Sequence, residues 1–406
     1  MSWDTVRFGD LYSAESRNGL TKPSRVRGSG YKMINMGELF ANDRIYDIPM
    51  ELVPLKDSEK VNSKVECGDL LFARQSLVLE GAGKCSIVME VSPLTVFESH
   101  LIRVRLDNKR ALPMFYYYYF KSPLSPMKSI VSQCAQAGIR GSDLQELQVI
   151  FPPVEEQQRI VDVISAYDDL IENNQKQIKL LEEVAQRLYK EWFVDLRFPG
   201  HETTPITDGI PEGWVEKTME DICDSIGGGT PSTKNDEYYR DGKIKWVTPT
   251  DITRKNSLIL LDTEKKITVE GLQHSSAKMV PPYTILMTSR ASVGFFGLCK
   301  YEVCTNQGFI SCVPYKENVR FFLLYNLMNR VDEIRGKASG STFLEISKKN
   351  FRGLRIVLPT DSVLDEFTKL VFPMVRQMET LTKSIATLQE ARDRLLPKLM
   401  NGEIEV

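Results

Sequence analysis

A stretch near the start of the chain carries five cations, no acid, and several glycine and serine residues. Arg17, Lys22, Arg25, Arg27 and Lys32 lie within sixteen residues. A mobile backbone lets N–H groups as well as cationic side chains reach a phosphate. The composition therefore predicts a flexible basic loop that contacts nucleic acid phosphates. By composition alone, a solvated surface loop is an equally good interpretation.

A comparable stretch lies in the other half of the chain. Residues 227–234 read Gly-Gly-Gly-Thr-Pro-Ser-Thr-Lys and precede Tyr238, Tyr239 and Trp246. Glycine lets the backbone approach a ligand closely, and aromatic rings and cations can contact nucleic acid. The GxxxxGK[ST] spacing of a nucleotide-binding loop is missing. The cations of this stretch are Lys234, Arg240, Lys243 and Lys245.

Guanidinium and amide groups are expected near strand ends in both halves. Arginine is geometrically matched to guanine, and asparagine or glutamine to adenine, in the major groove. The second half offers Arg290, Asn306 and Gln307 for this purpose, although Asn306 and Gln307 can equally close a turn. In the first half the counterparts are Arg74 and Gln75. Lys84 and Arg140 complete the candidate DNA contacts.

Signatures of catalysis and of metal binding are thin. The sequence has no HExxH and no GxSxG, and its three histidines and seven cysteines show no metal-ligand spacing. Pro281-Pro282-Tyr283 resembles an amino-methyltransferase core, but Val280 stands where Asp, Asn or Ser is needed. We therefore predict no catalytic residues, no metal and no bound cofactor. The scattered cysteines and the absence of an 18-residue apolar run favour a reduced, cytoplasmic protein.

Two long heptad-patterned segments must position these residues. Apolar residues alternate spacings of three and four over 155–193, and again over 361–400. A seam of this length indicates helix packed on helix, with the first segment about 58 Å long. Antiparallel pairing is expected; the alternative is that each helix packs on its own globular domain. The predicted seam contains Ile160, Ile164, Ile171, Asn174, Ile178, Leu181 and Leu188, then Met378, Leu381, Ile385, Leu388 and Leu395.

Two residues interrupt these patterns. Asn174 places a polar group on the first seam, where it either fixes the register or marks a local helix break. Pro373 lies inside the second pattern, where it is expected to kink the helix or to mark a helix boundary.

The two halves of the 406-residue chain repeat each other. At a shift of 207, Ile139 and Pro152 fall on Ile346 and Pro359, and the helix patterns coincide. Between them lie short β-type runs bounded by turns. We predict an α+β protein with two tandem domains containing small irregular sheets, separated by two long helices. The expected boundaries are 1–153 and 196–360 for the domains, and 154–195 and 361–406 for the helices.

In this order, the motifs resemble a specificity subunit of a type I restriction–modification enzyme. The resemblance rests on Gly228-Gly229-Thr230-Pro231-Ser232, Ser289-Arg290 and Thr305-Asn306-Gln307-Gly308-Phe309 in the second half. It also rests on Gly68–Arg74 and Phe151-Pro152-Pro153 in the first half, and on Arg392–Glu403 at the C-terminus. The first half has the 17–32 stretch in place of the Gly-Gly-Thr-Pro-Ser string.

The resemblance implies two target-recognition domains, each reading one half of a gapped double-stranded DNA site. The paired helices would set the spacing and dock methylation subunits. S-adenosylmethionine and ATP would be used by the methylation and restriction subunits, and the chain itself would be non-catalytic. Two alternatives stay open: a fused DNA methyltransferase, and a pure protein-interaction scaffold. An intramolecular helix pair allows the isolated chain to be a monomer.

Overall fold

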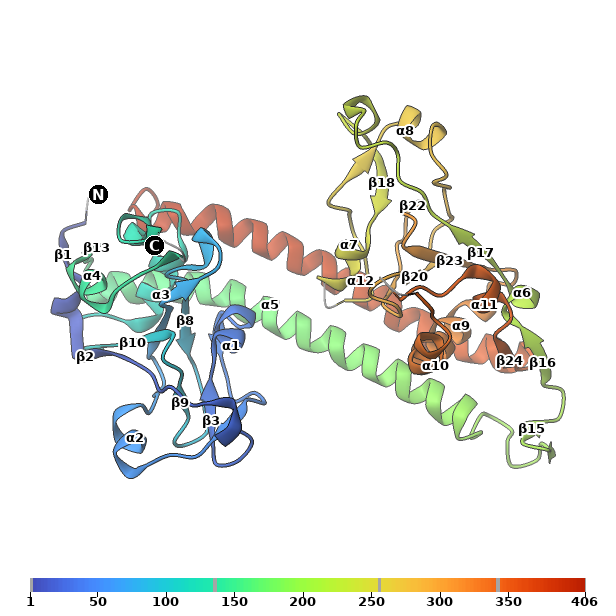
Figure 1. The fold of residues 1–406 in the computed structure, drawn as a ribbon, viewed down its shortest axis with the longest axis horizontal. Helices are drawn as coiled ribbons and strands as arrows, with labels where there is room; N and C mark the ends of the chain where they lie inside the picture. The colour runs from blue at the N-terminus through green and yellow to red at the C-terminus, as the bar shows by residue number, and fades with distance from the viewer. Residues whose placement is uncertain (1–2, 134–136, 255–256, 341–343, 406) are drawn as a thin grey trace. The chain divides into compact units, whose positions relative to one another are not determined.

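The computed structural model describes residues 3–133, 137–254, 257–340 and 344–405. The chain forms two compact units, which we call unit 1 (Met1–Asp169 with Leu388–Val406) and unit 2 (Leu170–Thr387). Each unit combines one globular half with a stretch of both long helices (Figure 1). The predicted α+β class is confirmed. Within the described residues, none of the helices combines the length and apolar character needed to span a membrane.

Unit 1 is built on a five-stranded sheet whose central strands are buried runs such as Leu70–Ala73. In spatial order its strands are β2 (Tyr12–Asn18), β10 (Leu101–Leu106), β6 (Leu70–Ala73), β8 (Cys85–Val88) and β4 (Arg44–Ile45). Three-stranded sheets flank it: β5 (Glu51–Val53), β3 (Tyr31–Ile34) and β9 (Val96–Phe97), and β11 (Ser132–Gln133), β12 (Ala137–Gly138) and β7 (Gln75–Ser76). Strand β1 (Thr5–Arg7) pairs with β13 (Gln148–Ile150).

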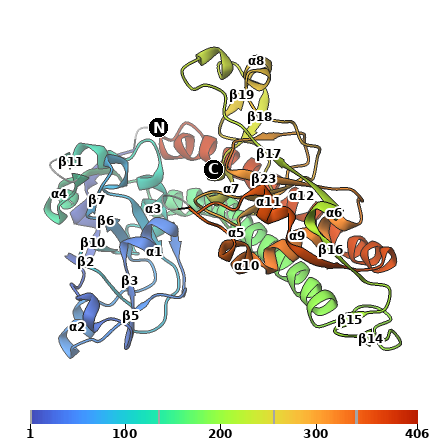
Figure 2. The same cartoon turned by 45° about the vertical axis from the view of Figure 1, so that its right-hand side comes forward.

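Unit 2 has the same plan with fewer strands (Figure 2). Its main sheet runs β17 (Cys223–Gly227), β23 (Phe309–Pro314), β20 (Ile285–Thr288) and β21 (Phe296–Gly297). A second sheet runs β19 (Lys266–Ile267), β18 (Ile244–Val247) and β22 (Cys304–Thr305), and β16 (Val215–Thr218) pairs with β24 (Arg355–Leu358). The stretch 198–213 contains the hairpin β14 (Ile206–Thr207) and β15 (Ile210–Pro211).

The strand registers show that the two units are structural repeats. The order β2-β10-β6-β8 matches β17-β23-β20-β21, and β5-β3-β9 matches β19-β18-β22. In both units the last pair is parallel, with Ile34 opposite Phe97 in one and Val247 opposite Thr305 in the other. Each domain core is closed by a helix of mostly apolar residues, α3 (Pro113–Lys121) and α9 (Val319–Asn329). A residue in one unit therefore has an identifiable counterpart in the other.

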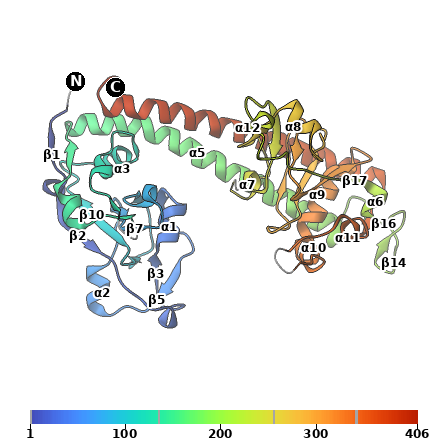
Figure 3. The same ribbon diagram turned by 45° about the horizontal axis from the view of Figure 1, so that its top comes forward.

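The two long helices are α5 (Val154–Tyr189), which ends in a π-helical turn at Lys190–Val194, and α12 (Asp361–Met400). They contact each other within each unit: Asp168 bonds Arg392 in unit 1, and Asn174 bonds Ser384 in unit 2. Because the partner's number falls as the α5 number rises, the helices are antiparallel, as predicted (Figures 1 and 3).

The helices also pack on the globular cores, so the two predicted packing modes coexist. Ile160 and Ile164 share a cluster with Leu399 and the aromatic residues of α3. Ile178 shares a cluster with Met378 and the core of unit 2. The predicted seam is buried at Ile160, Ile164, Ile171, Asn174, Ile178, Met378 and Leu381, and half-buried at Leu181, Leu188, Ile385, Leu388 and Leu395.

Neither of the two interrupting residues ends its helix. Helix α12 continues through Pro373, so the expected boundary there is wrong; Val371 and Val375, fully buried on either side, hold the turn in place. Helix α5 continues through Asn174, so a local break is also wrong. The Asn174 Nδ2 group donates to Ser384 Oγ at 3.2 Å, which satisfies the polar seam position.

Candidate nucleic-acid interface

The edge where β2 or β17 ends is built the same way in both units. The N–H of Leu20 donates to Phe97 O at 2.8 Å, and the N–H of Gly229 donates to Thr305 O at 2.9 Å. Leu20 and Gly229 are therefore equivalent positions. The 17–32 stretch thus occupies the place of the Gly-Gly-Thr-Pro-Ser string, as the sequence comparison of the two halves suggested.

The glycines at this edge serve packing within the chain. A Cβ on Gly19 would lie 2.1 Å from Phe97 O, and a Cβ on Gly228 would lie 2.1 Å from Asn306 O. No side chain fits at such distances. The idea that Gly228 lets the backbone approach a ligand is therefore corrected: the close approach is to the protein's own backbone.

The basic stretch 17–32 contains regular secondary structure, and three of its five cations are ion-paired. Arg17 belongs to β2, Arg25 to a 3-10 turn at Ser24–Val26, and Lys32 to β3, so the stretch is not one flexible loop. Three of its cations are paired with acids from elsewhere: Lys22 with Glu59 at 2.8 Å, Arg27 with Glu51 at 2.6 Å, and Lys32 with Asp47 at 2.7 Å.

Two of these ion pairs change the pKa of the acid involved. The hydrogen bond from Lys22 lowers the pKa of Glu59, and the hydrogen bond from Lys32 lowers the pKa of Asp47. Arg17 is exposed and donates to Asn62 Oδ1 at 3.0 Å, while Arg25 is also exposed. Arg17 and Arg25 are thus the cations of this stretch best placed for a phosphate.

In unit 2 the aromatic residues hold the glycine segment instead of facing outward. Trp246 is buried and its Nε1 donates to Gly229 O at 2.9 Å. The Tyr239 hydroxyl donates to Pro231 O at 2.7 Å. The stacking role considered for these rings is therefore corrected to a structural one. Tyr238 stacks on His274, with ring centroids 5.6 Å apart and planes inclined by 13°.

The cations of this region differ in availability. Lys234 and Lys243 are exposed, and Arg240 lies 3.8 Å from Asp236 with both side chains largely in solvent. Lys245 is tied to Asp262 at 2.6 Å. Burial alone would raise the pKa of Asp262, but hydrogen bonds from Lys245 and Lys266 lower it to about 2.

The amide residues after β22 form a turn, as the alternative interpretation held. The Asn306 Oδ1 atom accepts from the Gly308 N–H at 2.9 Å, and Gln307 Oε1 accepts from the Thr230 hydroxyl. Arg290 is 45% exposed and lies 3.7 Å from Glu345. Of these three predicted base-reading residues, Arg290 therefore retains the most freedom.

Backbone bonds define the counterpart of Arg290 in unit 1. The Ile139 N–H donates to Arg74 O at 2.9 Å, and the Ile346 N–H donates to Ser289 O at 3.0 Å. Arg74 thus matches Ser289, and Gln75 matches Arg290. The other predicted contacts of unit 1 are Lys84, whose Nζ donates to Phe40 O at 2.8 Å, and Arg140, which is exposed just before α4 (Gly141–Glu146).

Two residues after Gln75 begins an exposed apolar element that the sequence analysis did not predict. Leu77, Val78 and Leu79 are 89%, 59% and 46% exposed. The only signal in the sequence was the run of three consecutive apolar residues itself. We refer to Leu77–Leu79 as the apolar tip.

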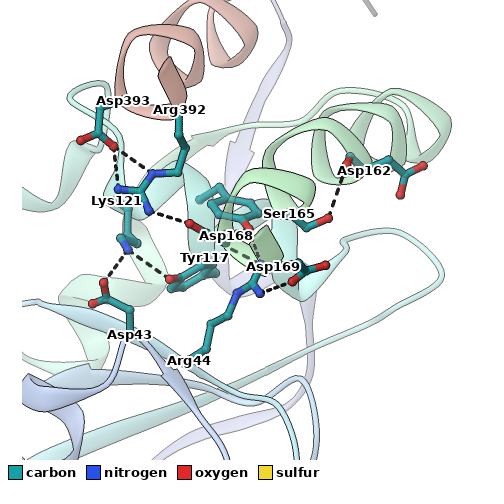
Figure 4. A network of polar contacts seen from close by, with 11 residues as sticks. Asp43, Arg44, Tyr117, Lys121, Asp162, Ser165, Asp168, Asp169, Arg392 and Asp393 are labelled. Atoms are coloured by element: carbon teal, nitrogen blue, oxygen red, sulfur yellow. Dashed lines mark hydrogen bonds and ion pairs between the residues drawn. The ribbon is translucent and has the colours of Figure 1, made fainter. Parts of the chain in front are cut away.

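A buried ionic network in unit 1 was also missed (Figure 4). Asp168 on α5 is 6% exposed and contacts Arg392 of α12 at 2.5 Å, the Tyr118 hydroxyl at 2.9 Å and Arg44 at 3.6 Å. Burial by itself would lower the pKa of Arg44, but Tyr118, Asp169 and Asp168 raise it instead. The network joins β4, α3 and both long helices. Its partners lie far apart in sequence, so no local pattern announces it.

Among residues 3–133, 137–254, 257–340 and 344–405, no three His, Cys, Asp or Glu side chains are grouped to hold a metal ion. Tyr283, in the motif resembling a methyltransferase core, accepts from Arg376 of α12 at 3.0 Å through its hydroxyl. That contact gives the tyrosine a packing role.

The fold and these edges define a class: a duplicated α+β protein with two dissimilar polar edges and two antiparallel helices. A family model described as "Type I restriction modification DNA specificity domain" matches residues 1–183 and 211–389. The chain therefore belongs to the type I restriction–modification DNA specificity family.

Known proteins with similar chains agree. The chain is 26% identical to the type I restriction enzyme MjaIX specificity subunit of Methanocaldococcus jannaschii, over 100% of this chain and 94% of that one. It is 24% identical to the HindI specificity subunit of Haemophilus influenzae, over 99% of each chain. The crystal structure of a type I restriction–modification S subunit from M. genitalium shares the fold, with a TM-score of 0.59 and 17% identity over 98% and 96% of the chains.

Proposed function

We propose that this chain is the non-catalytic, DNA-recognising subunit of a type I restriction–modification complex. Each unit would read one half of a gapped double-stranded DNA site. The observation that carries this proposal is the repeat itself: one strand order presents different side chains at equivalent positions, Gln75 in unit 1 and Arg290 in unit 2. Glutamine is matched to adenine and arginine to guanine, so equivalent edges would read different bases.

The paired helices would set the distance between the two half-sites. Helix α5 has 36 residues, which corresponds to about 54 Å at about 1.5 Å per residue. Equivalent major-groove faces one turn of DNA apart are separated by about 34 Å. A helix pair of this length is long enough to hold two readers that far apart.

The helices would also dock methylation subunits. In unit 2, large apolar side chains of both helices face solvent: Leu170 is 51%, Leu180 59%, Val184 48% and Leu370 47% exposed. These side chains, spread along the two helices, supply apolar surface that a partner subunit would cover. S-adenosylmethionine and ATP would be used by the methylation and restriction subunits, in the cytoplasm where the host DNA lies.

The test is the list of methylated adenines in the host genome, with and without the gene for this chain. We expect one gapped, two-part motif to lose methylation when the gene is removed. Purified chain should not transfer methyl groups from S-adenosylmethionine without a partner. An unchanged methylation pattern would contradict the recognition role, and methyl transfer by the chain alone would favour a fused methyltransferase.

A further inference from the structure

The loop that carries the apolar tip is longer in unit 1 than its counterpart in unit 2. Ala73 and Thr288 are equivalent, because the carbonyl of each accepts a backbone hydrogen bond from a glycine at the end of the loop. The Gly83 N–H donates to Ala73 O at 2.8 Å, and the Gly294 N–H donates to Thr288 O at 2.9 Å. Ten positions separate the first pair and six separate the second. Unit 1 therefore carries four additional residues within 76–82, the segment that contains the exposed apolar ones.

Local hydrogen bonds and close packing support the loop that carries the apolar tip. The Val78 N–H donates to Ser76 Oγ at 3.2 Å, and the Gly81 N–H donates to Val78 O at 3.1 Å. A Cβ on Gly81 would lie 2.2 Å from Ser76 Oγ, so the loop is tightly packed at its base. With 89% of its surface exposed, Leu77 keeps apolar area in water, and covering that area by a ligand would be favourable.

The residues next to the tip suggest what covers it. Gln75, which pairs with Gly138 in the sheet, directly precedes the loop and is suited to adenine in the major groove. Leu77 and Gln75 line one surface hollow of about 360 Å³ together with Met36, Phe40, Ser76 and His100. In an A·T pair the partner of the adenine is thymine, whose methyl group is the apolar feature of the major groove.

Resting on the proposed function, we infer that the apolar tip is a base-reading element of unit 1. It packs against a thymine methyl group beside the adenine contact suited to Gln75. Unit 2 has Arg290-Ala291-Ser292 at this place and would read its half-site without such a contact. A partner protein that docked in the same way on both units would not need an element that only one unit carries, so DNA is the favoured occupant.

The test uses the chain assembled with its methylation subunits and a DNA duplex containing the motif identified from the host genome. Each thymine of each half-site is replaced in turn by deoxyuridine, which removes the methyl group alone. Covering one methyl group contributes roughly a fourfold change in affinity. We expect such a loss for at least one thymine in the half-site of unit 1. The variant Leu77→Ser should bind normal DNA roughly fourfold more weakly and lose the response to deoxyuridine there.

The control is Val61→Ser, which changes a side chain that is 80% exposed elsewhere in unit 1 and should leave the deoxyuridine response intact. An equal deoxyuridine penalty in Leu77→Ser and the parent chain would overturn the inference. So would unchanged DNA affinity combined with weaker retention of the methylation subunits, which would assign the tip to a protein contact. If the parent complex shows no sequence-specific binding at all, the proposed function itself fails, and this outcome is distinct from the others.

Discussion

Arg392 of α12 donates to the carboxylate of Asp168 on α5 at 2.5 Å, across 224 positions of sequence. Both side chains are largely buried, at 18% and 8% exposure. Asp168 is also the acceptor for Tyr118 and lies 3.6 Å from Arg44, so one buried carboxylate is shared by two guanidinium groups. Each arginine has a second acid: Asp169 lies 2.6 Å from Arg44, and Asp393 lies 2.8 Å from Arg392. Asp168 therefore adds a polar link between both long helices and the globular part of unit 1, beside the apolar packing of Ile160, Ile164 and Leu399.

Replacing Asp168 should therefore destabilise unit 1 strongly. Asp168→Ala removes the buried acceptor shared by Arg44, Arg392 and Tyr118 while Asp169 and Asp393 remain, so we expect a loss of about 1.5–3 kcal/mol, the range for a hydrogen bond to a charged group. Chemical denaturation followed by circular dichroism measures this loss. Asp393→Ala is the matched control, because Asp393 also contacts Arg392 but its side chain is 63% exposed. Equal effects of the two substitutions would contradict the special weight given to Asp168.

Alanine substitution should destabilise the protein at the strand-edge glycines but not at glycines with open space around them. Gly19→Ala and Gly228→Ala drive a methyl group into a carbonyl 2.1 Å away and should cost about 1–3 kcal/mol in unfolding experiments. Gly37→Ala and Gly336→Ala, where nothing lies within 4 Å of the added Cβ, should be neutral or stabilising by up to about 1 kcal/mol. Tolerance of alanine at both Gly19 and Gly228 would argue against the close backbone approach.

Replacing the polar pair in the helix seam by apolar residues should stabilise the protein, although the pair would no longer fix how the two helices are aligned. Replacing Asn174 and Ser384 by Leu and Ala removes their 3.2 Å hydrogen bond and extends the apolar seam. The double variant should unfold at a higher temperature than the parent, as measured by calorimetry. Asn174→Ala alone should lower stability by about 1 kcal/mol, because the remaining partner loses its hydrogen bond. A double variant less stable than that single variant would contradict this account.

The proposed spacer role predicts the effect of shortening both helices. Removal of residues 170–176 and of the facing residues 383–389 takes out one heptad from each helix and about 10 Å of length. The recognised gap should shorten by about three base pairs, or binding should be lost, while the bases read in each half stay the same. Sequencing of methylated sites in cells checks this, and an unchanged gap would count against the spacer role.

Lowering the pH should weaken the ion pairs of Asp262 with Lys245 and Lys266 in unit 2. The pKa of Asp262 is lowered to about 2 by its two lysine partners. A lowered pKa contributes stability that is present at neutral pH and is lost as the pH falls from about 4 through about 2. Because the side chain is 52% exposed, the contribution should stay below about 1 kcal/mol. The stability difference between the parent and Asp262→Asn should shrink toward zero at pH 2.

The long helices and the α+β class could be predicted because their signals are local and repeated. Apolar spacings of three and four continue for the whole length of each helix, so a single proline or asparagine did not interrupt it. The partners of the basic residues could not be predicted in this way. Lys22 meets Glu59, and Arg27 meets Glu51, only because β3, β5 and α2 (Asp57–Asn62) fold together.

The same limit applies to the candidate interface. Glycine at 228 and the aromatic residue at 246 have the composition of a ligand site, yet each is explained by the other parts of its own domain. The backbone bonds of Ile139 and Ile346 match Arg74 with Ser289, so Arg290 corresponds to Gln75 and not to the arginine one residue earlier. Sequence alignment of the halves by eye does not reveal that correspondence.

The placement of Leu396, Leu399 and Met400 in the core of unit 1 has a consequence for biosynthesis. During translation, unit 2 has all of its residues once position 387 has left the ribosome, whereas unit 1 waits for the final turns of α12 although its own first residue emerged at the outset. The part made first is thus completed last. A stop codon shortly after codon 388 would remove core residues of unit 1 while leaving the residues of unit 2 intact.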